Sequence, residues 1–189
     1  MIATLISSTR TEVGAVTTTK LAMPTELAEP DTAFLADYAT SVVDRDELRF
    51  YFSKSHPFSG RATMLVEVSF GLQQFVDNVW PSIQGRFFDG VRLYCTAQRG
   101  QDWDQRIPEH LEDAVYQDRR ASTMQASYAG DDAVIDFYWL STRDMSNVIQ
   151  GHSRDVRVHP VLRVVIPTCT MWRCLEVCAE RIADGRRTK

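Results

Sequence analysis

Residues 155 to 166 read Asp155-Val-Arg-Val-His-Pro-Val-Leu-Arg-Val-Val-Ile166. Every even-numbered position in this stretch is apolar, whereas Arg157, His159 and Arg163 occupy odd-numbered positions. Because successive side chains of a strand point to opposite faces, this alternation predicts a strand with one buried face and one more polar face. Proline lacks a backbone donor and is confined in sheets to edges or bulges, so Pro160 predicts that the strand lies at a sheet edge.

Similar patterns predict the other elements. Period-two alternation indicates strands at 48–52, 63–70 and 91–96, and a hairpin formed by 124–128 and 133–140. Apolar residues at helical spacing indicate helices at 32–44, 72–83, 108–120 and 169–184, and a short helix between the capping residue Ser141 and Gly151. We expect Pro81 to kink or end the helix at 72–83.

This order of elements predicts an α+β protein with an antiparallel or mixed sheet and helices mainly on one face. If the helix at 108–120 and the first hairpin strand are set aside as insertions, the order matches the split strand-helix-strand arrangement called ferredoxin-like. An extra C-terminal helix follows. A different α+β layout with an antiparallel sheet is the alternative. We expect residues 1–30 to form an extended or irregular arm and residues 31–189 to form a single domain.

Composition narrows the function classes. The chain has 189 residues, a net charge of −4 and an ordinary hydrophobic content of 44%. Binding to nucleic acid requires clustered basic residues, so this charge argues against it. No apolar run approaches the roughly 18 to 20 residues of a membrane helix. The first thirty residues also lack the pattern of a secretory signal. We therefore expect a cytoplasmic protein without membrane insertion.

Four cysteines, Cys95, Cys169, Cys174 and Cys178, are expected to be reduced in that compartment. They contain no Cys-x-x-Cys pair, and the spacing of the last three is not that of a zinc knuckle. The sequence thus predicts neither a metal site nor a cofactor. Small buried thiols that fill a helix-to-sheet interface are the simpler interpretation.

Three histidines are weak candidates for a general base. His152 precedes an acid at Asp155, His56 lies among serines, and His159 lies between two arginines of the strand. No nucleophile elbow, zinc-binding helix motif or phosphate-binding glycine loop accompanies them. Whether the protein is an enzyme therefore stays open.

If the strands form one sheet with helices on one face, alternation places a set of polar residues together on the opposite face. The set comprises Glu67, Arg92, Tyr94, Asp136, Tyr138, Arg157, His159 and Arg163. A solvated face with charges paired across strands is one interpretation. A docking face is the other, because tyrosine and arginine are enriched at protein interfaces.

Our primary hypothesis is a soluble, non-catalytic protein that binds another protein or self-assembles, as an adaptor, an inhibitor or an assembly factor. The alternative is a small enzyme or ligand-binding protein that handles an anionic small molecule through Arg157, His159 and Arg163. A closed concave pocket around these residues would favour the alternative, and a flat surface with its charges paired would favour the primary hypothesis.

Overall fold

A computed structural model describes residues 5–12, 15–22, 27–56, 59–84, 86–98, 110–112, 116–149 and 157–187. The strands are β1 (Leu5–Glu12), β2 (Ala15–Ala22), β3 (Ala33–Leu35), β4 (Tyr38–Asp44), β5 (Glu47–Ser55), β6 (Arg61–Gly71), β7 (His110–Glu112), β8 (Gln117–Arg120), β9 (Thr123–Ala129), β10 (Asp132–Leu140) and β11 (Val158–Pro167). The helices are α1 (Leu72–Gln74), the π-helix η1 (Phe75–Val79), α2 (Trp80–Gln84), α3 (Arg86–Ala97), α4 (Thr142–Ile149) and α5 (Thr168–Arg187).

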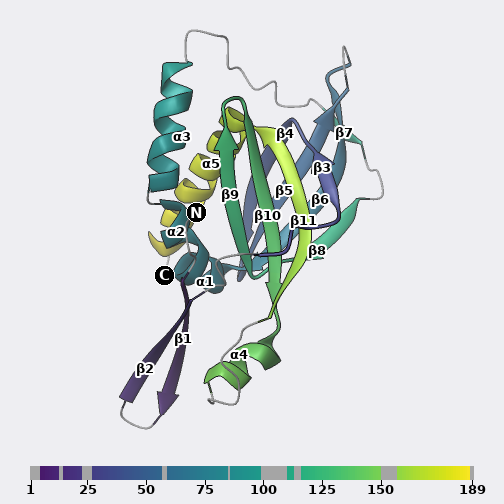
Figure 1. Cartoon of the computed structure of the whole chain (residues 1–189). Coiled ribbons are helices and arrows are strands. Elements are labelled where there is room, and N and C mark those ends of the chain that lie inside the picture. Colours follow the sequence, from purple (N-terminus) through teal and green to yellow (C-terminus); the bar gives the residue numbers. More distant parts are fainter. Residues whose placement is uncertain are drawn as a thin grey trace.

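Most of these strands belong to two sheets that lie one in front of the other (Figure 1). The first, called here the β10 sheet, has the order β3-β11-β10-β9. The second, called the β5 sheet, has the order β4-β5-β6-β7, and β8 also pairs with β6. Both sheets are mixed, because β3 is parallel to β11 and both β7 and β8 are parallel to β6. The α+β class with a mixed sheet is therefore confirmed.

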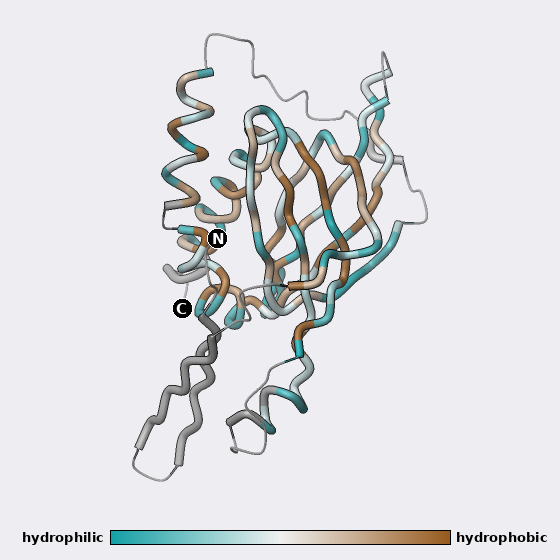
Figure 2. The backbone as a smooth tube through the Cα atoms, viewed as in Figure 1, coloured by the Kyte–Doolittle hydropathy of each residue, from teal (hydrophilic) through white to brown (hydrophobic). Residues whose placement is uncertain are grey.

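The main core lies between the inner faces of the two sheets. The ring of Phe137 on β10 lies 5.9 Å from that of Phe52 on β5 and 6.0 Å from that of Phe70 on β6, measured between centroids. All three side chains are almost completely buried. Figure 2 shows that the strands of both sheets carry much of the apolar sequence. Alternation along each strand thus supplies one apolar face to a shared core.

Helices close one side of this two-sheet layer. Helix α5 lies along β4 and also contacts β10 and β11, so it spans the gap between the sheets (Figure 1). Its buried residues include Met171, Leu175 and Cys178. Helix α3 packs on α5, with the rings of Phe88 and Trp172 4.4 Å apart. The predicted C-terminal helix is confirmed, and it fills the side of the core as well as covering a sheet.

The described chain passes directly between the two sheets at two places. The amide of Ala36 donates to the carbonyl of Val165 in the β10 sheet, and the amide of Asp37 donates to that of Ser53 in the β5 sheet.

The second crossing is at Ala121 and Ser122. The amide of Ala121 donates to the carbonyl of Ser69 in the β5 sheet, and the next amide, of Ser122, donates to the carbonyl of Tyr138 in the β10 sheet. Strands β8 and β9 flank this crossing. Short covalent links at both crossings therefore join the two sheets directly.

Two predictions of local structure were wrong in an instructive way. The segment 32–44 was predicted as a helix but contains β3 and β4. Ala39 and Ser41 are buried there, whereas Tyr38, Thr40 and Val42 are half-buried, so the burial follows a period of two. The segment 91–96 was predicted as a strand but belongs to α3. Val91 and Cys95 are buried while Leu93 is 67% exposed, which is the pattern of a helix face.

Two further expectations also need correction. The predicted helix at 108–120 contains β7 and β8 in its described residues, which are 110–112 and 116–120. Pro81 was expected to kink or end its helix. It does not end it, because α2 continues to Gln84; the kink stays a prediction. The π-helix η1 ends at Val79, and the amide of Trp80 donates to the carbonyl of Phe75 across this wider turn. A widened turn just before proline reduces the clash that its ring makes with the preceding turn.

The other predicted strands and helices are present. Strands at 48–52 and 63–70 correspond to β5 and β6, and the predicted hairpin corresponds to β9 and β10. The amide of Asp144 donates to Ser141 Oγ at 3.4 Å, so Ser141 caps α4 as expected.

A ferredoxin-like arrangement is not confirmed, because that fold has a single sheet whereas most of the described strands are divided between two sheets. The edge position expected for β11 holds for half of the strand. Strand β3 pairs only with Arg163 to Val165, so the first half of β11 has β10 alone as a described neighbour. Pro160 lies in that first half, next to a register shift at Phe137 and Tyr138. Proline thus occupies the edge-like, bulged part of the strand.

Strands β1 and β2 form an antiparallel hairpin, and among the described strands each pairs only with the other. Figure 1 shows the hairpin extending from the end of the molecule where α1 lies, and its described contacts with the body include η1. The division into an arm at 1–30 and a domain at 31–189 stays a prediction.

Replacing Phe137 by alanine should lower the free energy of unfolding by about 3–5 kcal/mol, because it removes the ring that joins both sheets and leaves a cavity. Urea denaturation followed by circular dichroism measures this change. Leu93→Ala is the control, because Leu93 is exposed and its truncation should have little effect. Equal losses for the two variants would contradict a shared core at Phe137.

Candidate functional site

The predicted single polar face does not exist as one surface, because the strands form two sheets and 91–96 is helical. The structure distributes its eight residues over separate places. Glu67 is on the outer face of the β5 sheet, Arg92 and Tyr94 are on α3, Arg157 and His159 are at the start of β11, and Asp136, Tyr138 and Arg163 are on the outer face of the β10 sheet. The last three alone are brought together by strand pairing.

Arg163 and Asp136 are cross-strand neighbours that form a bidentate ion pair. Arg163 Nε donates to Asp136 Oδ1 at 2.6 Å, and Nη2 donates to Oδ2 at 2.8 Å. The remaining terminal nitrogen, Nη1, donates to Glu29 Oε2 at 3.3 Å. These bonds, led by those to Asp136, raise the pKa of the Arg163 guanidinium. The donors of Arg163 are therefore directed at carboxylates of the protein itself, which leaves it poorly suited to hold a substrate anion.

Tyr138 follows Asp136 on the same face but is only 2% exposed. Burial, followed by the nearby Asp136 carboxylate, raises the pKa of its hydroxyl to about 12. The phenol therefore stays neutral at physiological pH. A side chain so deeply buried cannot contact a partner directly, so the role of Tyr138 is in packing beneath this face.

An apolar row crosses the same outer face beside the ion pair. Strand register places Leu35 of β3 next to Val165 of β11, and Val165 opposite Val134 of β10. Leu35 is 65% exposed, and the two valines are half-buried. The adjacent row contains Arg163 and Asp136. The outer face of the β10 sheet thus presents an apolar strip bordered by a self-paired charge cluster, and we call these five residues the outer patch.

Sequence reasoning missed the apolar half of the outer patch. Leu35 falls in the segment predicted as a helix at 32–44, and the predicted polar face contains only polar residues of each strand. The two valines do stand on the same side of their strands as Asp136 and Arg163 in the sequence pattern. That alternation could have identified them.

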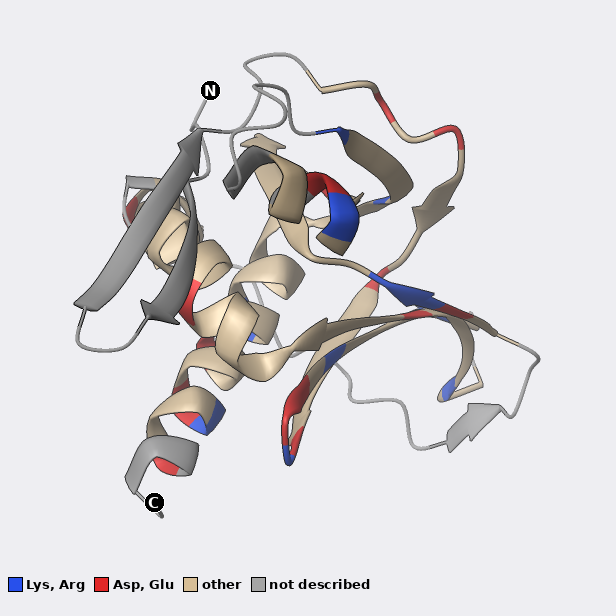
Figure 3. Ribbon diagram, turned by 90° about the horizontal axis from the view of Figure 1, so that it is seen from below, with Lys and Arg blue, Asp and Glu red and all other residues tan. Residues whose placement is uncertain are grey.

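The outer face of the β5 sheet carries a second charged group. Glu67 is only 6% exposed, and its Oε1 lies 3.6 Å from Arg49 Nε. Tyr116 donates a hydrogen bond to the Glu67 carboxylate, and this bond is the main reason that the pKa of Tyr116 is raised. Arg49 also donates to Glu47 Oε2 at 2.8 Å. The carboxylate of Glu67 is therefore already satisfied by the protein. Figure 3 shows acidic and basic residues spread over the described elements instead of gathered in one patch.

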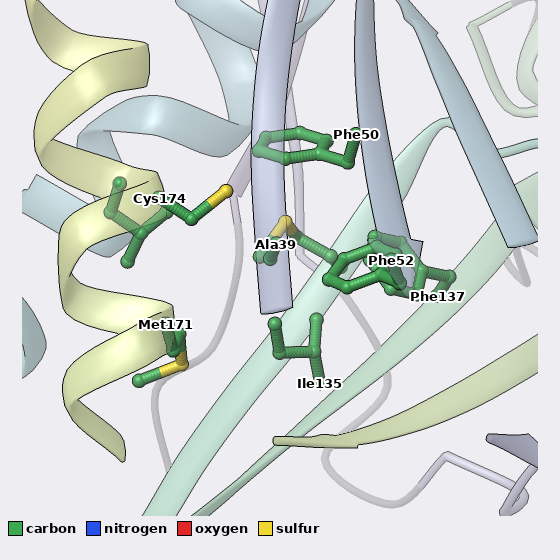
Figure 4. A pocket seen from close by; sticks show the side chains of 9 residues that line it. Ala39, Phe50, Phe52, Ile135, Phe137, Met171 and Cys174 are labelled. Carbon is green, nitrogen blue, oxygen red and sulfur yellow. The ribbon is translucent and has the colours of Figure 1, made fainter. Parts of the chain in front are cut away.

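A small cavity lies between the two sheets and α5 (Figure 4). It is lined by Ala39, Phe50, Phe52, Met124, Ile135, Phe137, Met171, Cys174 and Leu175. Its volume of ≈ 10 Å³ is about that of a single water-sized sphere, and no polar group lines it. Ligand pockets typically measure about 300–1,000 Å³. This space is therefore a packing gap. Arg157, His159 and Arg163, the residues of the anionic-ligand hypothesis, are not among the residues that line it.

Of the three candidate general bases, the two that the structure describes lie at different sheets, His56 directly after β5 and His159 on β11. His56 is exposed, and its Nε2 lies 2.7 Å from Thr63 Oγ1. His159 is exposed on β11, opposite Trp139 of β10. His152 lies outside the described residues. A catalytic role for these histidines stays an untested prediction.

The cysteines are free and buried, as expected for thiols that fill a helix interface. Burial raises the pKa of Cys178 to about 12 and also raises that of Cys174, so both stay protonated near neutral pH. Within the described part of the chain, no cluster of three or more histidine, cysteine, aspartate or glutamate side chains has the geometry to hold a metal ion.

No known family model, curated protein or solved structure matches this chain. Among the helices that the structure describes, none has the length and apolar character to cross a bilayer. The site must therefore be judged from its own geometry.

Arg163→Ala should destabilise the protein by about 1–3 kcal/mol, because it leaves the largely buried Asp136 carboxylate without its cation. Urea denaturation measures the loss. Arg92→Ala is the matched control, since its pair with Asp89 is exposed on both sides and should contribute little. The double replacement Arg163→Met and Asp136→Leu should recover most of the loss. If Arg163→Ala leaves the free energy of unfolding unchanged, Asp136 does not depend on Arg163 as its buried partner.

Tyr138 should make the protein less stable as pH rises from about 10 to about 12. Its pKa in the folded state, about 12, is above the unfolded value of about 10, so the unfolded chain loses this proton first. Unfolding then becomes easier as pH increases through this window. Tyr138→Phe should weaken the pH dependence, measured by urea denaturation at about pH 9 and about pH 11. An unchanged pH slope would contradict the raised pKa.

Proposed function

We propose that this chain is a non-catalytic, cytoplasmic protein that acts by binding another protein through the outer patch. The observation that carries the proposal is the exposed apolar row Leu35, Val165 and Val134 beside the ion pair of Arg163 and Asp136. Protein interfaces commonly have an apolar centre and a polar rim. The outer patch has both parts on neighbouring rows of one sheet.

The state of the charges supports this proposal. Arg163 and Asp136 already neutralise one another, so covering them costs less than covering two unpaired ions. Glu29 is 78% exposed beyond Arg163 and offers a free carboxylate oxygen at the rim for a donor on the partner. Leu35 supplies the exposed apolar side chain that a partner can bury.

The exposure of the sheet edges also supports the outer patch as the binding surface. Strand β4 lies against α5, and β9 contacts η1. Strand β8 has the sequence Gln117-Asp-Arg-Arg120 and is fully exposed, so its charges discourage the addition of another strand. Strand β3 lacks such protection in the described structure, and its last residue, Leu35, belongs to the outer patch. A partner on this face therefore also reaches an open edge, which favours either a second protein or self-assembly.

The alternative, a small enzyme or a protein that binds an anionic small molecule, has less support. It requires Arg157, His159 and Arg163 around a pocket. Arg163 is paired to Asp136 and Glu29, whereas Arg157 and His159 are exposed at the start of β11. The cavity in the core is too small and too apolar for an anion.

Replacing Leu35 by aspartate should reduce partner capture at least tenfold, because it places a charge in the apolar centre of the outer patch. Tagged protein is used for affinity capture from lysate of the source cells, followed by mass spectrometry. Light scattering after size exclusion reports self-assembly in parallel. Circular dichroism verifies that the variant folds.

Leu93→Asp is the matched control, since Leu93 on α3 is 67% exposed and lies outside the outer patch. Proteins lost with Leu35→Asp but retained with Leu93→Asp support the proposal. If both variants retain the same proteins and the same oligomeric state as the unmodified chain, the outer patch is not the binding surface.

A further inference from the structure

Two of the four buried cysteines contact one another although they are far apart in the sequence. Cys95 lies in the last turn of α3, and Cys169 is the second residue of α5. Their side chains form a thiol–thiol hydrogen bond, and each residue is 6% exposed. The two thiols therefore meet at the packed interface of two helices.

One residue of the β9–β10 turn holds both cysteines in place. The hydroxyl of Tyr94, next to Cys95, donates to the carboxylate of Asp131. The amide of Thr168, next to Cys169, donates to the backbone carbonyl of Asp131 at 2.7 Å. The residue before each cysteine is thus bonded to the same partner.

Aromatic contacts outside the thiol pair also hold α3 in place. The rings of Phe88 on α3 and Trp172 on α5 lie 4.4 Å apart. Tyr94 of α3 packs against Tyr128 of β9, with ring centroids 6.1 Å apart. Helix α3 is therefore also held by Phe88 and by the residue next to Cys95, which keeps the thiols adjacent without requiring a covalent bond.

We propose that Cys95 and Cys169 are an oxidation site, at which a small disulfide such as glutathione disulfide converts the two thiols into an intramolecular disulfide that joins α3 to α5. This inference is independent of the outer patch.

The reaction is ordinary thiol–disulfide exchange. One cysteine thiolate attacks the sulfur–sulfur bond of the oxidant, which forms a mixed disulfide and releases the first glutathione thiolate. The second cysteine thiolate then attacks the protein sulfur of that mixed disulfide and displaces the second glutathione. The two cysteines lose two protons and two electrons in total, and one glutathione disulfide becomes two glutathione thiols.

The surroundings make the reaction slow but specific. Burial raises the pKa of Cys169, the hydrogen bond from Cys95 lowers it in part, and the Asp131 carboxylate raises it, so the net direction is upward and little thiolate is present at neutral pH. An oxidant reaches the pair through local opening of the last turn of α3, where Leu93 and Ala97 are exposed. Once one thiol has reacted, the contact between the two residues favours the intramolecular second step.

Cys174 and Cys178 provide the matched comparison. They are also buried, but both lie on α5, one helical turn apart; Cys174 lines the core cavity and the thiol of Cys178 interacts with Ser41 of β4. Replacing both by serine removes half of the thiols while leaving the proposed pair intact.

The test uses the full chain incubated folded, at about pH 8, with excess glutathione disulfide, followed by alkylation and peptide mapping without reductant. The expected result is a crosslinked peptide that joins Cys95 to Cys169, with two of the four thiols remaining. Hydrogen exchange of the α3 amides should slow after oxidation and recover after reduction.

The variants separate this site from general oxidation. Cys95→Ser and Cys169→Ser should each abolish the crosslink and the slowed exchange, whereas the double variant Cys174→Ser and Cys178→Ser should retain both. The wild-type peptide map remains decisive if a serine variant fails to fold. The proposal is overturned if all four thiols stay reduced, if only glutathione adducts form, or if the crosslink joins Cys174 or Cys178.

Discussion

The contact of Phe137 with Phe52 and Phe70 is the interaction on which the rest of the fold depends. It joins the inner faces of two sheets that share no hydrogen-bonded strand ladder among the described strands. Burial of apolar area is non-directional, so the sheets need only present apolar faces of matching size. Helix α5 then has a defined place, because the side of the layer beside β4 would otherwise expose Phe50 and Ile135.

The sequence was a good guide wherever one face of an element is fully buried. Strands β11 and β6 were predicted from period-two alternation, and α5 was predicted from apolar residues at helical spacing. It was a poor guide for short elements whose apolar residues fit two periods. Val91, Leu93 and Cys95 alternate in the sequence, but the exposure of Leu93 shows that a helix was the right answer.

The candidate site could be predicted only in part, for a different physical reason. The pairing of Asp136 with Arg163 follows from two strands that are both recognisable in the sequence. The position of Leu35 does not, because β3 joins the sheet as a parallel strand of three residues, too short to produce a pattern. Glu67 was misplaced because the sequence contains no local signal for the number of sheets. Arg92 and Tyr94 were misplaced because 91–96 alternates like a strand but belongs to α3.

The step between Ala121 and Ser122 has a consequence for how the molecule unfolds. Two stacked sheets joined by long loops can separate and unfold one after the other. Here adjacent amides are bonded to different sheets, so pulling either sheet away strains the same peptide. Loss of one sheet would also expose the aromatic face of the other. The two sheets are therefore expected to behave as one cooperative unit, with a single unfolding transition shared by β5, β6, β10 and β11.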